Sequence, residues 1–257
     1  MQGLMMHCGG TTATMKELGL VKMPEATETH HPIAHDLFVE LVLETIDRRG
    51  LDVRSTSFGL NKDGGQMFGL IRCDAINDET GLAFGLRGSH NKSLSRALAG
   101  GERVFVCDNL VFDGDGFVVM RKHTKNAWED LERMVDEAIC RAIDPETGHR
   151  RKARMDRLKE EVCNTTKGYG ILGKAVGQGV LTPTQANVAF REWTDPSHLA
   201  FVPRTEWSLY NAGTEGLKKG AVSSVIDRHT AWDDFMDWQS DRGWRHLDHL
   251  SETHRDL

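Results

Sequence analysis

The chain has 257 residues and a formal net charge of −6 at pH 7, with 39% hydrophobic and 27% charged residues. This composition allows a sizeable buried core and argues against wholesale disorder, and the acidic balance argues against a generally basic nucleic-acid-binding surface while leaving room for a local basic groove. Its five cysteines form no CxxC pair, no signal-peptide pattern is present, and no stretch approaches the ~18 apolar residues of a membrane span. We therefore expect an intracellular protein with reduced thiols and no membrane contact.

The first predicted elements are an irregular segment over residues 1–32 and a helix that follows it. Ile33, Leu37 and Leu41 recur at helical spacing, and Gly50 supplies a stop signal.

The pattern then changes to the period of two that is typical of strands. About five strands are expected, at residues 52–60, 66–74, 82–86, 103–112 and 117–123. Because short turns join most of them, they imply an antiparallel sheet. The last two form a predicted hairpin whose turn is centred on Gly114-Asp115.

From residue 126 onward the pattern is helical. An apolar stripe of Trp128, Leu131, Val135 and Ile139 is broken at Pro145. Further helices are expected near residues 152–164, 184–193, 205–217 and 223–238. Strands followed by helices predict the α+β class, with helices packed on one face of the sheet.

The predicted organisation has three parts. Residues 1–32 form an irregular N-terminal segment, residues 33–144 an α+β sheet domain, and residues 145–257 a helical region that packs on the sheet as one domain with it.

Polar residues gather on the predicted hairpin. With its turn at residues 114–115, Asp108 faces Arg121, and His123 lies two residues further along the same, otherwise apolar face. A polar functional site at the end of the sheet explains this cluster, and so does a structural ion pair covered by a helix, which is the commoner case.

The loop before the fourth strand is dense in hydrogen-bond donors. Arg87 to Lys92, followed by a helix start predicted at residues 93–99, are suited to bind an anion such as phosphate. A capped loop, with Ser89 or Asn91 as the cap, is the structural alternative. The combined candidate nucleic-acid- or anion-binding residues are Arg87, Ser89, His90, Asn91, Lys92, Asp108, Asn109, Arg121 and His123.

Other polar groups favour structural interpretations. The histidines at positions 30, 31, 35, 246 and 249 lack partners at ligand spacing, so we expect surface side chains and neither a metal nor a cofactor. Cys107 would need His90 or His123 on its side to act as a nucleophile, and a buried inert thiol is the favoured interpretation. The basic residues at positions 150–159 could contact phosphates or form a solvated helix face.

Several segments carry a family resemblance. They are Phe58-Gly59-Leu60, residues 65–69, residues 85–93, residues 100–110, residues 121–124 and residues 207–215. Together they cover most of the chain and resemble the phage/plasmid-like family of unknown function, most specifically in the sequence Val-Phe-Val-Cys-Asp-Asn-Leu at residues 104–110. The family's loop often carries Asp after Ser-His, where this chain has Asn91.

The resemblance implies a mobile-element protein in the cytoplasm of a bacterial host, without supplying an activity. The leading hypothesis is a non-enzymatic accessory protein that binds single-stranded DNA, for which a homo-oligomer would provide a shared groove. The alternatives are an anti-defence or host-takeover protein that binds a host protein, and a small hydrolase or nuclease with a site around the central hairpin.

Overall fold

A computed structural model of the protein describes residues 11–28, 30–75, 80–91, 93–104, 110–112, 118–121, 127–218 and 224–242. The strands of its single sheet are β1 (Thr11–Ala13), β2 (Val53–Leu60), β3 (Gln66–Ala75), β4 (Thr80–Ser89), β5 (Arg96–Val104), β6 (Leu110–Phe112) and β7 (Val118–Arg121). The strand order is β1-β2-β3-β4-β5-β6, β7 also pairs with β5, and every pairing is antiparallel.

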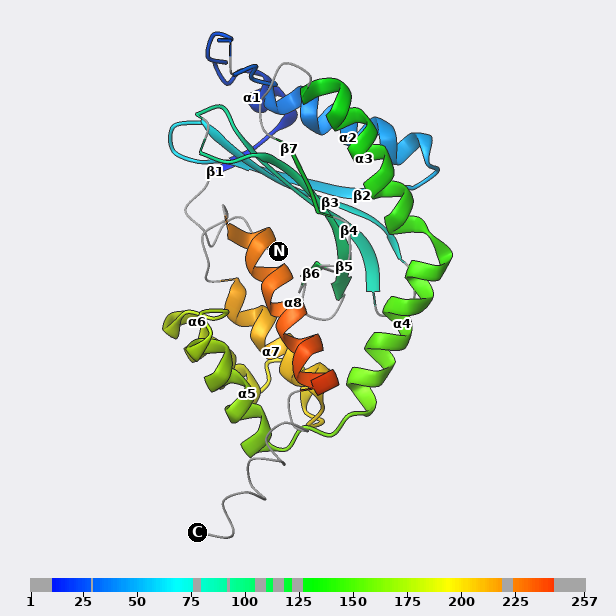
Figure 1. The fold of residues 1–257 in the computed structure, drawn as a ribbon, viewed down its shortest axis with the longest axis vertical. Coiled ribbons are helices and arrows are strands. Elements are labelled where there is room, and N and C mark those ends of the chain that lie inside the picture. The colour runs from blue at the N-terminus through cyan, green and yellow to red at the C-terminus, as the bar shows by residue number, and fades with distance from the viewer. Residues whose placement is uncertain are drawn as a thin grey trace.

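Helices lie on both faces of this sheet (Figure 1). They are α1 (Met15–Gly19), α2 (His35–Arg48), α3 (Ala127–Ile143), α4 (Pro145–Glu160), α5 (Thr165–Gly177), α6 (Pro183–Thr194), α7 (Glu206–Leu217) and α8 (Val225–Arg242), with a short 3-10 turn at Leu199–Phe201. The α+β class is confirmed. The expectation that helices cover one face is too simple, because α2 and α3 pack on one face and α8 on the other.

Two apolar clusters hold the sheet between its helices. One face supplies Met67, Ile71, Phe84 and Leu98 to a core that includes buried side chains of α1, α2 and α3. On the opposite face, small residues of β4 and β5 pack with Ile226 of α8. Residues 81–90 are all buried as a result, so β4 behaves as a strand of the interior.

Helix boundaries follow local signals. Asp144 caps α4 by accepting from the backbone N–H of Thr147, with Pro145 in the first turn. Gly50 adopts a φ of +73° just after α2, a conformation that glycine reaches without steric cost. Thr14 forms a capping box with Glu17 at α1, so the segment that we predicted to be irregular contains β1 and α1.

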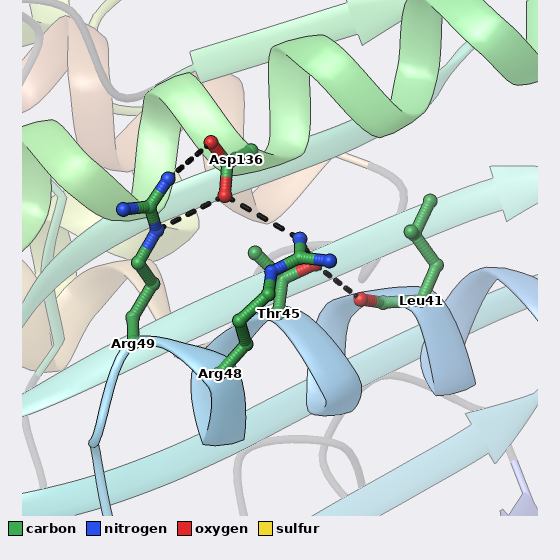
Figure 2. A network of polar contacts seen from close by, with 5 residues as sticks. All are labelled: Leu41, Thr45, Arg48, Arg49 and Asp136. Carbon is green, nitrogen blue, oxygen red and sulfur yellow. Dashed lines mark hydrogen bonds and ion pairs between the residues drawn. The ribbon is translucent and has the colours of Figure 1, made fainter.

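An ion-pair network joins α2 to α3 (Figure 2). Asp136 accepts from Arg49 Nε at 3.0 Å and Nη2 at 2.5 Å, and from Arg48 Nη2 at 3.4 Å. Hydrogen bonding from Arg49 lowers the pKa of Asp136. Since these side chains are partly exposed, the network contributes at most about 1 kcal/mol per pair.

The fourth and fifth predicted strands are arranged differently from the expectation. Where we predicted the start of a helix at residues 93–99, β5 begins at Arg96. Leu110 pairs with Arg103 and Val119 with Leu98, so β6 and β7 both lie along one edge of β5. The predicted hairpin between residues 103–112 and 117–123 is therefore wrong, because β6 and β7 form their backbone hydrogen bonds with β5 and not with each other.

The helical half has its own aromatic core. Trp193, Trp207 and Trp232 are buried, as expected for packing residues, whereas Trp238 is partly exposed. Gly213 of α7 lies directly against Trp232, and a Cβ at that position would approach the indole to 2.1 Å. A glycine is thus required where α7 and α8 cross.

None of the helices in the described part of the chain is both long enough and apolar enough to cross a bilayer.

We expect Gly213→Ala to lower the free energy of unfolding by about 1–3 kcal/mol, because the added methyl group overpacks a buried contact. Gly173→Ala in α5 is the matched control, since its Cβ would meet nothing within 4 Å; that change should be neutral or gain up to about 1 kcal/mol. Urea unfolding followed by circular dichroism measures both, and equal stability of the two variants would contradict this account of the α7–α8 crossing.

Candidate functional site

The predicted anion-binding loop divides its side chains between the two faces of the sheet. Arg87 is buried on the α8 face, where its Nη1 pairs with Asp227 Oδ2 at 2.6 Å. His90 is buried on the opposite face against α2, where its ring stacks on His35. Arg87 and His90 therefore do not converge on a common ligand.

The remaining described residues of the loop stabilise its turn. Ser89 Oγ donates to the carbonyl of Leu94 at 3.0 Å and accepts from the Leu94 N–H at 2.9 Å. Asn91 Oδ1 accepts from the Ser93 N–H at 3.1 Å. This is the capped loop of the structural alternative, although a strand rather than a helix follows it. Lys92 lies outside the described residues.

The hairpin cluster falls mostly outside the described residues. Asp108, Asn109 and His123, together with Cys107, are not described, and of Arg121 only the backbone is, paired with Arg96 across β5 and β7. The contact between Asp108 and Arg121 was expected from the hairpin pairing, which β6 and β7 do not form, and Asp108 itself lies outside the described residues.

A buried polar cluster lies where α2 begins. Ile33 presents its carbonyl oxygen to His90 Nε2 at 3.1 Å and to Arg96 Nη2. His35 Nε2 lies 3.2 Å from the carbonyl of Gly64 in the β2–β3 turn. Since a carbonyl oxygen only accepts, both imidazoles carry their proton on Nε2. The prediction of surface histidines is therefore wrong for His35, and it is also wrong for the buried His30.

Burial dominates the electrostatics of this cluster. It lowers the pKa of Arg96 to about 9 against the opposing effect of Asp36, so the guanidinium stays charged at neutral pH. Burial first and the Arg96 charge second lower the pKa of His90, while the hydrogen bond to Ile33 opposes them. The Arg96 cation also lies 5.3 Å from the ring centroid of Phe38. His90 is therefore held neutral beside a fixed cation.

Three basic side chains of α4, Arg151, Lys152 and Arg154, form contacts with other groups of the protein. Arg151 donates to the carbonyl of Ala142, and Lys152 pairs with Asp156. Arg154 binds Asp233 at 2.9 Å and Asp237 at 2.6 Å, both from α8. The stretch thus fastens α4 to α8 more than it presents a phosphate-binding face.

A groove of about 750 Å³ lies between α5, α6 and α7. Its lining mixes aromatic, apolar and charged side chains, with Tyr169, Asn187, Val188, Phe190, Arg191, Glu192, Thr194, Asp195, Ser197 and Glu215 along it. Tyr169 donates to or accepts from Thr194 Oγ1 at 2.9 Å, and its ring lies 5.9 Å from that of Phe190.

No sequence motif marks this groove, so we did not predict it. Tyr169 stands between Gly168 and Gly170 on a helix that we did not predict. The only available signal was the charged end of α6, where Arg191, Glu192 and Asp195 follow one another closely.

Within the described ranges, no group of three or more His, Cys, Asp or Glu side chains is placed to hold a metal ion.

No family model, curated protein or solved structure matches the chain. The resemblance to the phage/plasmid-like family therefore stays a prediction.

Replacing Arg154 with Met should lower the free energy of unfolding by on the order of 3 kcal/mol, because the buried Asp233 would lose its ion pair with Arg154. The OH of Tyr210, which donates to Asp233 at 2.8 Å, cannot replace that charge.

Arg133→Met is the matched control, since Arg133 forms an exposed pair with Glu137 one turn away and should contribute about 0.5 kcal/mol or less. Chemical denaturation compares the two. A cost for Arg154→Met no larger than that of the control would contradict the role of α4 in holding α8.

Proposed function

We propose that the protein acts by binding a partner protein, which it docks in the groove between α5, α6 and α7. The observation that carries the proposal is the chemistry of this groove. An exposed aromatic side chain, Tyr169, stands beside Phe190 in a concave surface of about 750 Å³. Concave surfaces that combine aromatic anchors with a polar rim are typical of recognition sites.

The charges of the groove point to a basic partner segment. Glu192, Asp195 and Glu215 contribute carboxylates, and Arg191 is the one cation among the described residues that line the groove. Glu192 accepts from the N–H and hydroxyl of Ser197, and Glu215 pairs with Lys218. Since Lys218 neutralises Glu215, the excess negative charge comes from Glu192 and Asp195 against Arg191, and it favours Lys or Arg side chains over phosphate groups.

Exposed apolar side chains follow the groove along the chain. Leu199, two residues beyond Ser197, is 90% exposed, and Val202 is 54% exposed. Large apolar side chains exposed in the segment that follows the groove residues favour contact with protein rather than with nucleic acid.

The nucleic-acid hypothesis has less support from the described residues. Arg87 is buried against α8, and the cations at positions 151, 152 and 154 have intramolecular partners. In the mobile-element setting that the sequence resemblance suggests, the partner is a host protein, as in the anti-defence hypothesis.

A peptide-display library panned on the protein, with the Asp195→Lys variant as counter-selection, tests the proposal. We expect the enriched peptides to combine Lys or Arg with an aromatic or large aliphatic residue. Binding of a selected peptide should weaken by about tenfold or more in Asp195→Lys and in Tyr169→Ala, because these variants remove charge and anchor complementarity.

Asp47→Lys is the matched control: it reverses an exposed carboxylate on α2 and should leave peptide binding unchanged. Failure to enrich any peptide, or equal binding to Asp195→Lys, would contradict the proposal. Binding of a labelled single-stranded oligonucleotide, measured by fluorescence anisotropy at low and high salt, tests the competing hypothesis of nucleic-acid binding. Salt-sensitive oligonucleotide binding that is equally strong in the wild type and in Asp195→Lys would instead support nucleic-acid recognition.

A further inference from the structure

The start of α2 is fastened to the turn end of the sheet by buried side chains. His90 from β4's end and Arg96 from β5 both donate to the carbonyl of Ile33, just before the helix. His35, the first residue of α2, reaches the carbonyl of Gly64 in the β2–β3 turn. These contacts tie three separate segments to one point.

The two imidazoles lie face to face at that point. Their ring centroids are 3.8 Å apart with an interplanar angle of 4°. His35 is 0% exposed and His90 is 5% exposed. Stacking this close is favourable for neutral rings and unfavourable once positive charge is added to them, because water cannot screen that charge.

The groups that surround the pair make protonation costly. Arg96 is 1% exposed and carries a charge, and the buried His30 also lowers the pKa of His90. Asp36 is the opposing carboxylate and lowers part of the cost. Among the described residues that act on His90, only the Asp36 carboxylate favours its protonated form. The Arg96 guanidinium and the His30 imidazole disfavour it, and the His35 ring is stacked on it.

We propose that the stacked His35–His90 pair is an acid-sensitive latch, whose protonation releases the start of α2 and the segment before it from the turns of the sheet. The inference is independent of the groove and of the partner that occupies it. In this role the cluster makes the attachment of α2 to the sheet depend on pH.

The direction of the pH effect follows from the pKa of His90, which is lowered in the folded protein. The unfolded imidazole has a pKa near 6.5, so it binds more protons than the folded one as the pH falls below about 7. The stability contributed by the neutral ring is therefore fully present above about pH 6.5 and is lost as the pH falls through the folded pKa.

Hydrogen exchange at pH 7.5 and pH 5.5, expressed as protection factors, tests the latch. We expect protection of the first turns of α2 to fall severalfold at the lower pH, with about tenfold as the limit for one imidazole whose unfolded pKa is near 6.5. Protection of α6 and α7 should stay unchanged, because the helical core does not contain the pair.

The His90→Gln variant keeps an N–H donor for Ile33 and removes the titration, so protection should become insensitive to this pH change. His35→Gln is a second variant if the first does not fold: it removes the stacked partner while His90 still titrates, so the fall in protection should be smaller than in the wild type. His149→Gln, on the exposed surface of α4, is the control that should behave as wild type. Unchanged protection of α2 in the wild type between the two pH values would overturn the proposal. An equal fall in His90→Gln or His35→Gln would also overturn it.

Discussion

The structure depends on the burial of β4 and β5 between two helical layers. Because both faces of these strands are covered, each polar side chain on them requires a partner inside the protein. Arg87 meets Asp227 of α8 on one face, and His90 and Arg96 meet the carbonyl of Ile33 on the other. The same contacts hold α8 and α2 in place, so the polar residues of the strands position the two layers that cover them.

Much of the fold could be predicted from local pattern. The helical stripe that became α3 and the turn after β2 were recognised because amphipathic helices and tight turns are determined by neighbouring residues. β5 was missed because Ala97, Leu98 and Ala99 are all buried, so a continuous apolar run replaces the alternation of a half-exposed strand. α5 was missed because its four glycines weaken the helical signal. The predicted hairpin failed because pairing with a third strand is not visible in a local turn sequence.

The candidate site illustrates the same limit. A row of donors from Arg87 to Lys92 resembles an anion-binding loop when residues are counted along the chain, but strand alternation directs Arg87 and His90 to opposite layers. Conversely, the groove between α5, α6 and α7 combines residues such as Tyr169, Asp195 and Glu215, which are distant in sequence. Its acidic and aromatic lining therefore forms only when the three helices pack together, and it cannot be recognised in the linear sequence. The described side chains of the donor-rich loop, Arg87 to Asn91, serve the fold, and we assign recognition to a surface of the helical half.

The most direct test of this division is hydrogen exchange of the protein with and without a saturating basic, aromatic-containing peptide selected for binding. Our account predicts added protection at the end of α6 and around Tyr169, with no change in the turns at residues 61–66 and 89–95. Added protection confined to those turns, with α6 unaffected, would contradict the assignment of recognition to the groove.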